Sequence, residues 1–204
     1  MLYVAKYSGP FGYLKPWTAV RDSETFSQQF LTPSVIEGIE KKLFPELLEQ
    51  SGIFKIKRYR LTYSGLSKQQ EQTQPRGIKQ KQVKKNNLRS IEISRPRSIL
   101  IRGVLVNPIL FLCFDSEEDA LKAVSQHICL CRNEDILMPD PEIIKVTEDE
   151  FDDPKGIFRG FELRFGKNEN SFVVGFNRFN NNEPMYGWLH IVGENPLRSD
   201  IEEI

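Results

Sequence analysis

The sequence predicts an α+β fold in which two helices pack on one face of an antiparallel sheet. Segments rich in β-branched and aromatic residues alternate with two amphipathic helical segments. Turn residues such as Ser8-Gly9-Pro10 and Asn107-Pro108 separate the strand-like segments. The chain has 204 residues, and its fourteen Phe and two Trp supply enough apolar bulk for a core.

The predicted elements follow in order along the chain. Residues 2–7 predict a strand, and a helix begins near Thr32 with Pro33 at its first position. Ser34 and Glu37 offer an alternative capping box, and the apolar face of this helix would hold Val35, Ile36, Ile39 and Leu43. A second strand is expected at 53–63, a loop at 64–87, the returning arm of a hairpin at 88–93, and apolar strands at 99–106 and 109–114.

A second helix is expected from Ser116, because acidic residues at 117–119 suit a helix N-terminus. Its core face would be Ala120, Leu121, Val124 and Ile128, and a short strand follows at 143–146. This β-α-β-(insertion)-β-α-β order is that of a ferredoxin-like, or RRM-like, fold with an inserted hairpin.

The sequence predicts two regions. Residues 1–147 would form the ferredoxin-like domain, with a basic β-hairpin inserted near 64–98. Residues 148–204 would form a β-rich C-terminal part with strands at 158–165, 172–179 and 185–192. These last strands would form a small sheet of their own or extend the first sheet.

Charge is segregated along the chain although the formal net charge is zero. Residues 55–102 contain fourteen Lys/Arg against two acidic residues, a net charge of +12, whereas residues 115–153 contain thirteen Asp/Glu against three Lys/Arg. A basic block of this length favours a nucleic-acid backbone as its partner, whereas the acidic block is more typical of a solvated face.

The residues of the basic block also have the chemistry that binds RNA. Arginines expected on or beside strands can contact phosphates with two hydrogen bonds, and loop lysines act as mobile charges. Tyr59, Tyr63 and Trp17 are neighbouring aromatic residues that could stack on unpaired bases. The predicted RNA-binding residues are Lys15, Trp17, Arg21, Arg58, Arg60, Arg76, Lys79, Lys81, Lys84, Lys85, Arg89, Arg95, Arg97 and Arg102.

Other functional classes have less support. The two histidines, His127 and His190, are more typical of structural or surface residues than of catalytic bases, and the phosphate-binding and nucleophile motifs are missing. The His127-x-Cys129-x-Cys131 segment does not have the ligand spacing of a zinc site. Three cysteines without a framework spacing and the lack of a long apolar run favour a cytoplasmic protein without disulfides, cofactor, metal or membrane span.

The N-terminal part of the chain resembles a known family. The resemblance lies in Gly9-Pro10-Phe11-Gly12-Tyr13-Leu14-Lys15-Pro16-Trp17-Thr18, then Ser23-Glu24-Thr25-Phe26, then Thr32-Pro33-Ser34-Val35-Ile36-Glu37-Gly38-Ile39. These segments are similar to the RAMP-superfamily subunit that caps the guide-RNA 5′ end in CRISPR interference (Cascade-type, type I) complexes. In that family a β-hairpin thumb is inserted where the basic insertion lies here, and Gly38 would let the helix approach the sheet closely.

The resemblance implies a non-catalytic subunit of an RNA-guided antiviral complex. Its partners would be the 5′ handle of the guide RNA, the repeated backbone RAMP subunit, the large subunit and, indirectly, target DNA; recruitment of a nuclease or of transposition proteins stays open. Lys15, Trp17 and Arg21 would lie near the handle, and the thumb residues Arg76, Lys79, Lys81, Lys84 and Lys85 would clamp RNA or the neighbouring subunit. The alternatives are a metal-independent endoribonuclease that processes the guide precursor, as in some branches of the family, and a protein-interaction module without RNA.

Overall fold

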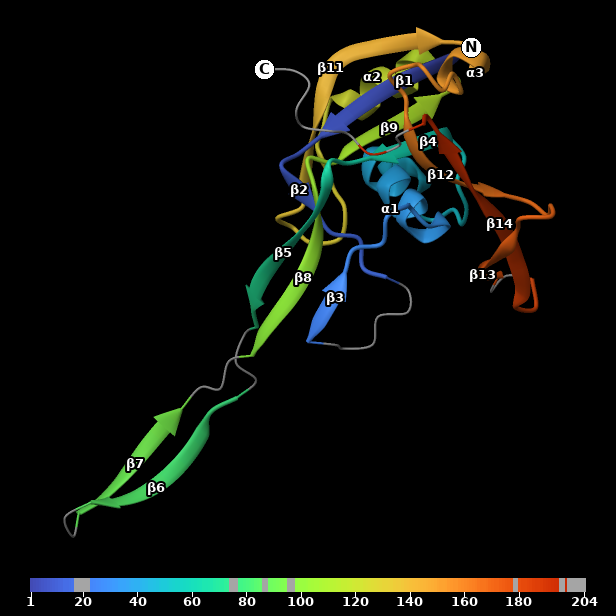
Figure 1. Cartoon of the computed structure of the whole chain (residues 1–204). Coiled ribbons are helices and arrows are strands. Elements are labelled where there is room, and N and C mark those ends of the chain that lie inside the picture. The colour runs from blue at the N-terminus through green and yellow to red at the C-terminus, as the bar shows by residue number, and fades with distance from the viewer. Residues whose placement is uncertain are drawn as a thin grey trace.

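The computed structural model describes residues 1–16, 23–73, 77–85, 88–94, 98–177, 180–194 and 197, and for 83–85 and 88–90 it describes the backbone alone. Eight strands form one antiparallel sheet in the order β10-β11-β1-β9-β4-β12-β14-β13 (Figure 1). The strands are β1 Leu2–Ser8, β4 Ile56–Thr62, β9 Ile109–Phe114, β10 Ile128–Cys129, β11 Ile136–Val146, β12 Gly160–Phe165, β13 Phe172–Asn177 and β14 Glu183–Val192.

The prediction of a ferredoxin-like α+β fold was wrong. The molecule is mostly β, with 49% strand against 15% helix, and its sheet has eight strands where four were expected. The C-terminal strands account for much of the difference, because β12 pairs with β4 at Phe161↔Leu61 and β14 and β13 follow it outward. Of the two placements expected for these strands, the structure has the extension of the first sheet.

A second sheet is built around strand β8 (Ile99–Val106), which directly precedes β9 of the main sheet in the chain. It contains β2 (Phe11–Gly12), β3 (Glu24–Phe26), β5 (Gly65–Gln72) and β8, and β8 pairs with each of the other three. A separate pair consists of β6 (Lys79–Lys85) and β7 (Leu88–Ser94). The break between β8 and β9 falls at Asn107-Pro108 as predicted, and Asn107 has a positive φ of 47°.

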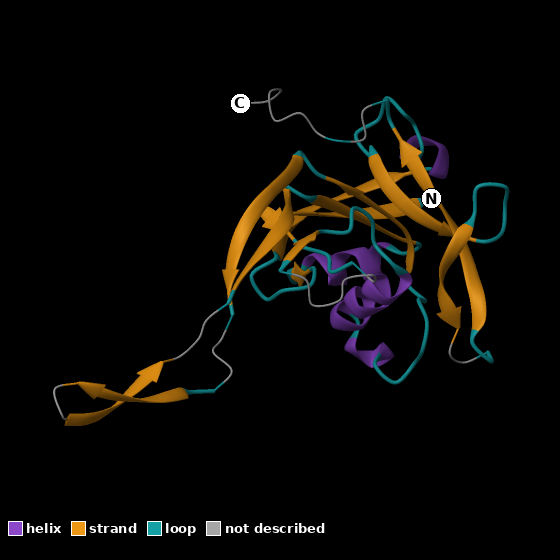
Figure 2. Ribbon diagram, turned by 60° about the horizontal axis from the view of Figure 1, so that its bottom comes forward, coloured by secondary structure: helices purple, strands orange, loops and turns teal. Residues whose placement is uncertain are grey.

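The two longer helices cover one face of the main sheet (Figure 2). In α1 (Pro33–Leu43), Pro33 lies in the first turn, and Ile36, Ile39 and Leu43 are buried against the sheet. In α2 (Glu117–Val124), the Ser116 side chain accepts a hydrogen bond from the Asp119 backbone N at 3.2 Å and caps the helix. A 3₁₀ turn, η1 (Pro45–Leu47), follows α1.

Two expectations about the helices were wrong. Leu121 was predicted to face the core but is 55% exposed, because α2 ends at Val124 and buries its alanines, Ala120 and Ala123, instead. Gly38 was expected to allow close approach of α1 to the sheet. A Cβ added there would meet no atom within 4 Å, so packing does not require this glycine.

The opposite face of the sheet has its own apolar cluster. Val4, Phe111 and Cys113 are buried there beside Phe151 and Phe158. Phe151 ends the short helix α3 (Glu148–Phe151), which begins with a capping box between Thr147 and Glu150. Of the helices in the described part of the chain, none is long and apolar enough to cross a membrane.

Candidate nucleic-acid interface

Two antiparallel strand pairs, together called the hairpin arm, extend away from the body of the molecule (Figure 1). The hairpin arm consists of β5, β6, β7 and β8: β5 pairs with β8 from Gly65↔Val106 to Gln72↔Ile99, and β6 pairs with β7 from Lys79↔Ser94 to Lys85↔Leu88. The pair β6–β7 forms the far end in both overall views. The predicted returning arm at 88–93 is confirmed as β7, whereas the loop predicted at 64–87 was wrong because it contains β5 and β6.

The far end of the hairpin arm carries the unneutralised charge. Strands β6 and β7 hold four lysines and one arginine against one glutamate, a net charge of +4 over their residues. Lys79 and Lys81 are exposed and, two residues apart on one strand, lie on the same face. Lys79 is opposite Ser94 and Lys81 is opposite Glu92 in the register. Among the residues whose side chains are described, neither lysine lies within ion-pair distance of a carboxylate. The backbones of Lys84 and Arg89 are opposite each other in the register.

The base of the hairpin arm is fixed by Arg102, another predicted RNA-binding residue. Its guanidinium donates a hydrogen bond to Thr25 Oγ1 at 2.6 Å and forms an ion pair with Glu71 at 3.4 Å. It also lies 5.9 Å from the centre of the Tyr13 ring. The side chain is only 15% exposed. Arg102 therefore joins β3, β5 and β8, and most of its surface is not available to RNA.

The other cations of the basic block near the body are neutralised within the chain. Lys57 Nζ lies 3.2 Å from Asp115 Oδ2, and Lys55 forms an ion pair with Asp119. Both acidic residues belong to the block at 115–153. The acidic block is thus more than a solvated face, because two of its residues neutralise the lysines at the start of strand β4.

Arg58 and Arg60 were predicted to bind RNA, and their placement contradicts that role. Arg60 is fully buried; its Nη2 lies 2.7 Å from Asp152 Oδ1 and 3.1 Å from Glu162 Oε2, and its Nη1 donates to the carbonyl of Phe158 at 2.8 Å. Arg58, 13% exposed, contacts the same two carboxylates at 2.7 and 2.6 Å. Both arginines form ion pairs inside the protein. The sequence prediction missed this, because the alternation of residues along a strand does not show that two acidic residues from a distant segment meet them.

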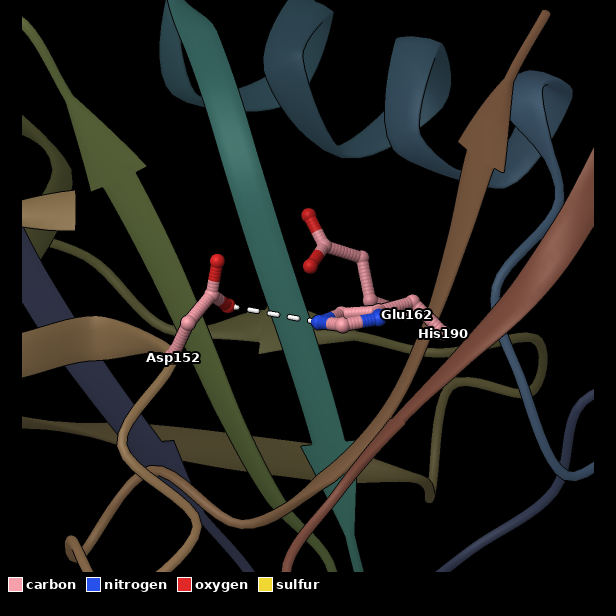
Figure 3. A group of neighbouring side chains, drawn as sticks. All are labelled: Asp152, Glu162 and His190. Carbon is pink, nitrogen blue, oxygen red and sulfur yellow. Dashed lines mark ion pairs between the residues drawn. The ribbon is translucent and has the colours of Figure 1, made fainter. Parts of the chain in front are cut away.

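These carboxylates belong to a cluster with His190 (Figure 3). Ligand atoms of Asp152, Glu162 and His190 lie within 4.8 Å of one another, which is a spacing compatible with a metal ion. However, Arg164 also contacts Asp152, at 2.9 Å, so three guanidinium groups surround two carboxylates. This local excess of positive charge repels a cation, and the carboxylate oxygens already accept hydrogen bonds. The cluster is an ion-pair network that joins β4, β12, β14 and the end of α3.

Burial and the neighbouring arginines together shift the pKa values of Asp152, Glu162 and His190. Burial opposes ionisation of Asp152 and Glu162, yet hydrogen bonds from Arg58 and, for Asp152, from Arg60 hold the pKa of both carboxyls below the usual range. Burial lowers the pKa of His190, and the nearby charge of Arg164 lowers it further. His190 is thus held neutral beside ionised carboxylates.

Strand pairing brings one histidine, His190, close to the arginines of the basic strand β4 through their shared partner Asp152. Glu162 is opposite His190 in the register of β12 and β14, and His190 Nε2 lies 3.4 Å from Asp152 Oδ1. His127 is exposed just before β10, and the cysteines are free, with Cys113 buried. The tyrosine on the same strand as Arg58, Tyr59, is buried and hydrogen-bonded to the carbonyls of Leu31 and Leu163.

The remaining predicted residues divide into two groups. Lys15 is exposed, and its backbone N lies 3.3 Å from Cys131 Sγ. Five predicted residues lie outside the described residues: Trp17, Arg21, Arg76, Arg95 and Arg97. Next to Lys15 the structure has a pocket that the sequence did not suggest, lined by Gln28, Phe30 and Phe161 among others. These residues come from separate segments, so no local pattern could have brought them together.

No protein-family model matches the chain, and no curated protein matches its sequence.

Proposed function

We propose that this chain is a non-catalytic RNA-binding subunit of a larger complex and that the hairpin arm grips the RNA. One observation carries the proposal. Where side chains are described, the basic block is neutralised by acidic neighbours on the body, at Lys55, Lys57, Arg58 and Arg60, and unneutralised at the far end of the hairpin arm, at Lys79 and Lys81. An exposed row of lysines on a projecting ribbon suits a phosphate backbone.

The isolated far end supports a role in binding. A two-stranded ribbon is marginally stable alone in water, and β6 and β7 pair only with each other among the described strands. Exposed apolar residues lie on it as well, since Ile91 and Ile93 are each 61% exposed. An RNA strand or a protein neighbour in a complex would stabilise such a ribbon.

The nature of the RNA is inferred from the N-terminal resemblance. The segments around Lys15 and Pro33 are similar to the RAMP-superfamily subunit of Cascade-type complexes, and we propose the same role for this chain. It would hold the 5′ handle of a CRISPR guide RNA and join the repeated backbone subunit to the large subunit. The proposed role is to hold the RNA without cutting it.

Charge reversal at the far end of the hairpin arm tests the proposal. Lys79→Glu/Lys81→Glu should weaken binding of a labelled repeat-derived RNA at least tenfold. If each lysine contacts one phosphate, the slope of log K against log salt should fall in magnitude by about 1.4. Lys42→Glu/Lys155→Glu is the matched control, because it makes the same charge change at two exposed lysines of the body. Equal losses in both variants, or no loss in the first, would refute the grip.

Incubation of the protein with repeat RNA in EDTA separates holding from cutting. The proposal expects intact RNA. His190 contacts Asp152, which also contacts Arg58 and Arg60 of β4, so a discrete product that disappears in His190→Ala would instead establish the endoribonuclease. The interaction module would be favoured by two results together. The protein purified at physiological salt would have a ratio of absorbance at 260 and 280 nm typical of protein alone, and it would not bind added RNA.

A further inference from the structure

A pocket of about 400 Å³ lies between the N-terminal segment and the C-terminal strands. Pro16 and residues 27–30 line one part of it, and Phe161 of β12 and Leu189 of β14 line another. Its volume falls within the range of small-ligand sites. Residues far apart in the sequence therefore form one hollow beside the exposed Lys15.

Hydrogen bonds fix the position of the polar side of the pocket. The Leu14 backbone N donates to Ser27 Oγ at 2.9 Å, and the Gln28 backbone N donates to the Leu14 carbonyl at 2.8 Å. These bonds hold Leu14 alongside Ser27 and Gln28. The Tyr63 hydroxyl, just after β4, donates to Gln29 Oε1 at 2.5 Å. This bond fixes the side-chain amide of Gln29, which also lines the pocket.

The aromatic side of the pocket is equally fixed. Phe161 stacks on Tyr63 with ring centres 6.0 Å apart and an angle of 25° between the rings. Phe30 and Phe161 both pack against the main core. Two anchored rings thus present apolar surface to whatever enters, with little side-chain entropy left to lose.

Gln28, which lines the pocket, has an unused hydrogen-bond donor. Its Nε2 is enclosed by the protein, and the described residues offer it no acceptor. A buried donor without a partner is unfavourable, and a turn of the Gln28 side chain into the pocket would let a ligand acceptor satisfy it. Gln28 Oε1 on the same amide adds an acceptor, and a carboxamide can bind the N6/N7 edge of adenine with two hydrogen bonds.

The charges around the pocket indicate which part of a ligand enters. The described lining residues carry no charge, which disfavours a phosphate or carboxylate inside. Lys15 is exposed and adjoins the lining residue Pro16, so a cation stands at the edge. A neutral planar group inside and an anion outside describe a nucleotide.

We propose that this pocket binds a single unpaired purine base, with adenine preferred, through Gln28 and the rings of Phe30 and Phe161. The inference rests on the proposed RNA-binding function and deepens it, because it gives the protein a base-specific contact separate from the hairpin arm. The hairpin arm then supplies affinity for any sequence, and the pocket supplies the preference for one base.

The test compares the full-length protein with Gln28→Leu, which keeps the side-chain size and removes both polar atoms. Fluorescence anisotropy measures binding of the RNA octamers A₈ and U₈, and ligand-observed NMR measures binding of adenosine 5′-monophosphate. The protein should bind A₈ about tenfold more tightly than U₈. Gln28→Leu should abolish this preference and the adenosine monophosphate signal, with U₈ affinity and melting temperature unchanged. Lys79→Glu/Lys81→Glu should weaken both octamers equally and leave the preference intact.

The outcomes separate the two proposals. RNA binding with the same affinity for A₈ and U₈, or a preference that survives Gln28→Leu, overturns the pocket and leaves the RNA-binding function standing. If neither octamer binds, the RNA-binding function fails and the mononucleotide decides: binding that Gln28→Leu abolishes supports the base pocket, and no binding overturns it. A Pro-rich peptide that binds in place of the nucleotide and is lost in Gln28→Leu also overturns it.

Discussion

Buried charge is the residue-scale feature with the largest consequences in this molecule. Arg60 and Glu162 are both almost fully buried and form an ion pair with each other. Arg60 also pairs with Asp152, and Glu162 also pairs with Arg58. Such a network contributes little net stability compared with apolar residues of the same size, but a missing or protonated member leaves an uncompensated buried charge. The protein should therefore respond strongly to any condition that protonates the network.

Acidification is expected to destabilise the protein in two stages. The pKa of His190 is lowered from 6.5, so as pH falls through that value the unfolded chain takes up a proton that the folded chain resists. The pKa values of Asp152 and Glu162 are also lowered, from 3.8 and 4.5, so their stabilisation is present above these values and is lost as pH falls below them. Melting temperatures measured from pH 8 to pH 3 should thus fall first near neutrality and again in acid.

His190→Gln separates these two stages. The variant should keep the loss of melting temperature in acid and show a smaller decrease between pH 7 and pH 5. An unchanged decrease in that interval would assign it to another group. Residue type alone could not have predicted this network, because Arg58 lies 94 residues before Asp152 and 104 residues before Glu162 in the sequence and strand pairing brings them together.

At the scale of secondary-structure elements, the sequence predicts best the helices and strands that bury one apolar face in the core. Strand β1, helix α1 and strand β4 were expected close to their observed bounds, because an apolar periodicity marks each of them. Helix α2 begins after the predicted cap Ser116, but it ends at Val124, and Ile128, which was predicted on its core face, lies in β10. The inserted hairpin near 64–98 was predicted, but its strands β5 and β6 were assigned to a loop, because Gln and Lys dominate them and both of their faces are largely exposed to solvent. Without a buried face there is no alternation of apolar and polar residues to detect.

The same exposure predicts that the two ends of the hairpin arm differ in dynamics. Strand β8 pairs with β2, β3 and β5, whereas β6 and β7 pair only with each other in the described part of the chain. Hydrogen–deuterium exchange followed by mass spectrometry should show amides of 79–94 exchanging much faster than those of 99–106, because small isolated ribbons open readily.

Repeat-derived RNA should slow exchange in 79–94 if the hairpin arm grips it. The peptide covering β11 is an internal control, since it lies in the main sheet and should not change. Protection of the main sheet alone would place the RNA elsewhere on the protein.

At the scale of the whole molecule, the C-terminal part is joined to the rest by charge as well as by strand pairing. Residues 148–204 were expected to be β-rich and either to form a small sheet of their own or to extend the first sheet. In the structure, Asp152 and Glu162 neutralise Arg58 and Arg60 of β4, and β12 pairs with the same strand. Leu163 and Val174 belong to the main core. Composition and strand patterns cannot reveal such dependence, because they do not specify which strand edge receives the added strands.

This dependence predicts that the fragment 1–147 does not fold alone. It would leave Arg60 buried without a counter-charge and expose the edge of β4 together with Val4 and Phe111, which the segment carrying Phe151 and Phe158 covers. The fragment should give a poorly dispersed amide NMR spectrum and no cooperative thermal transition. The full chain should give a well-dispersed spectrum and a cooperative transition. The double variant Arg58→Leu/Arg60→Leu of the fragment serves as the control, because regained folding there would identify the uncompensated charge as the cause. A well-dispersed spectrum of the unaltered fragment would show instead that residues 1–147 form an independent domain and that the C-terminal strands are an addition to it.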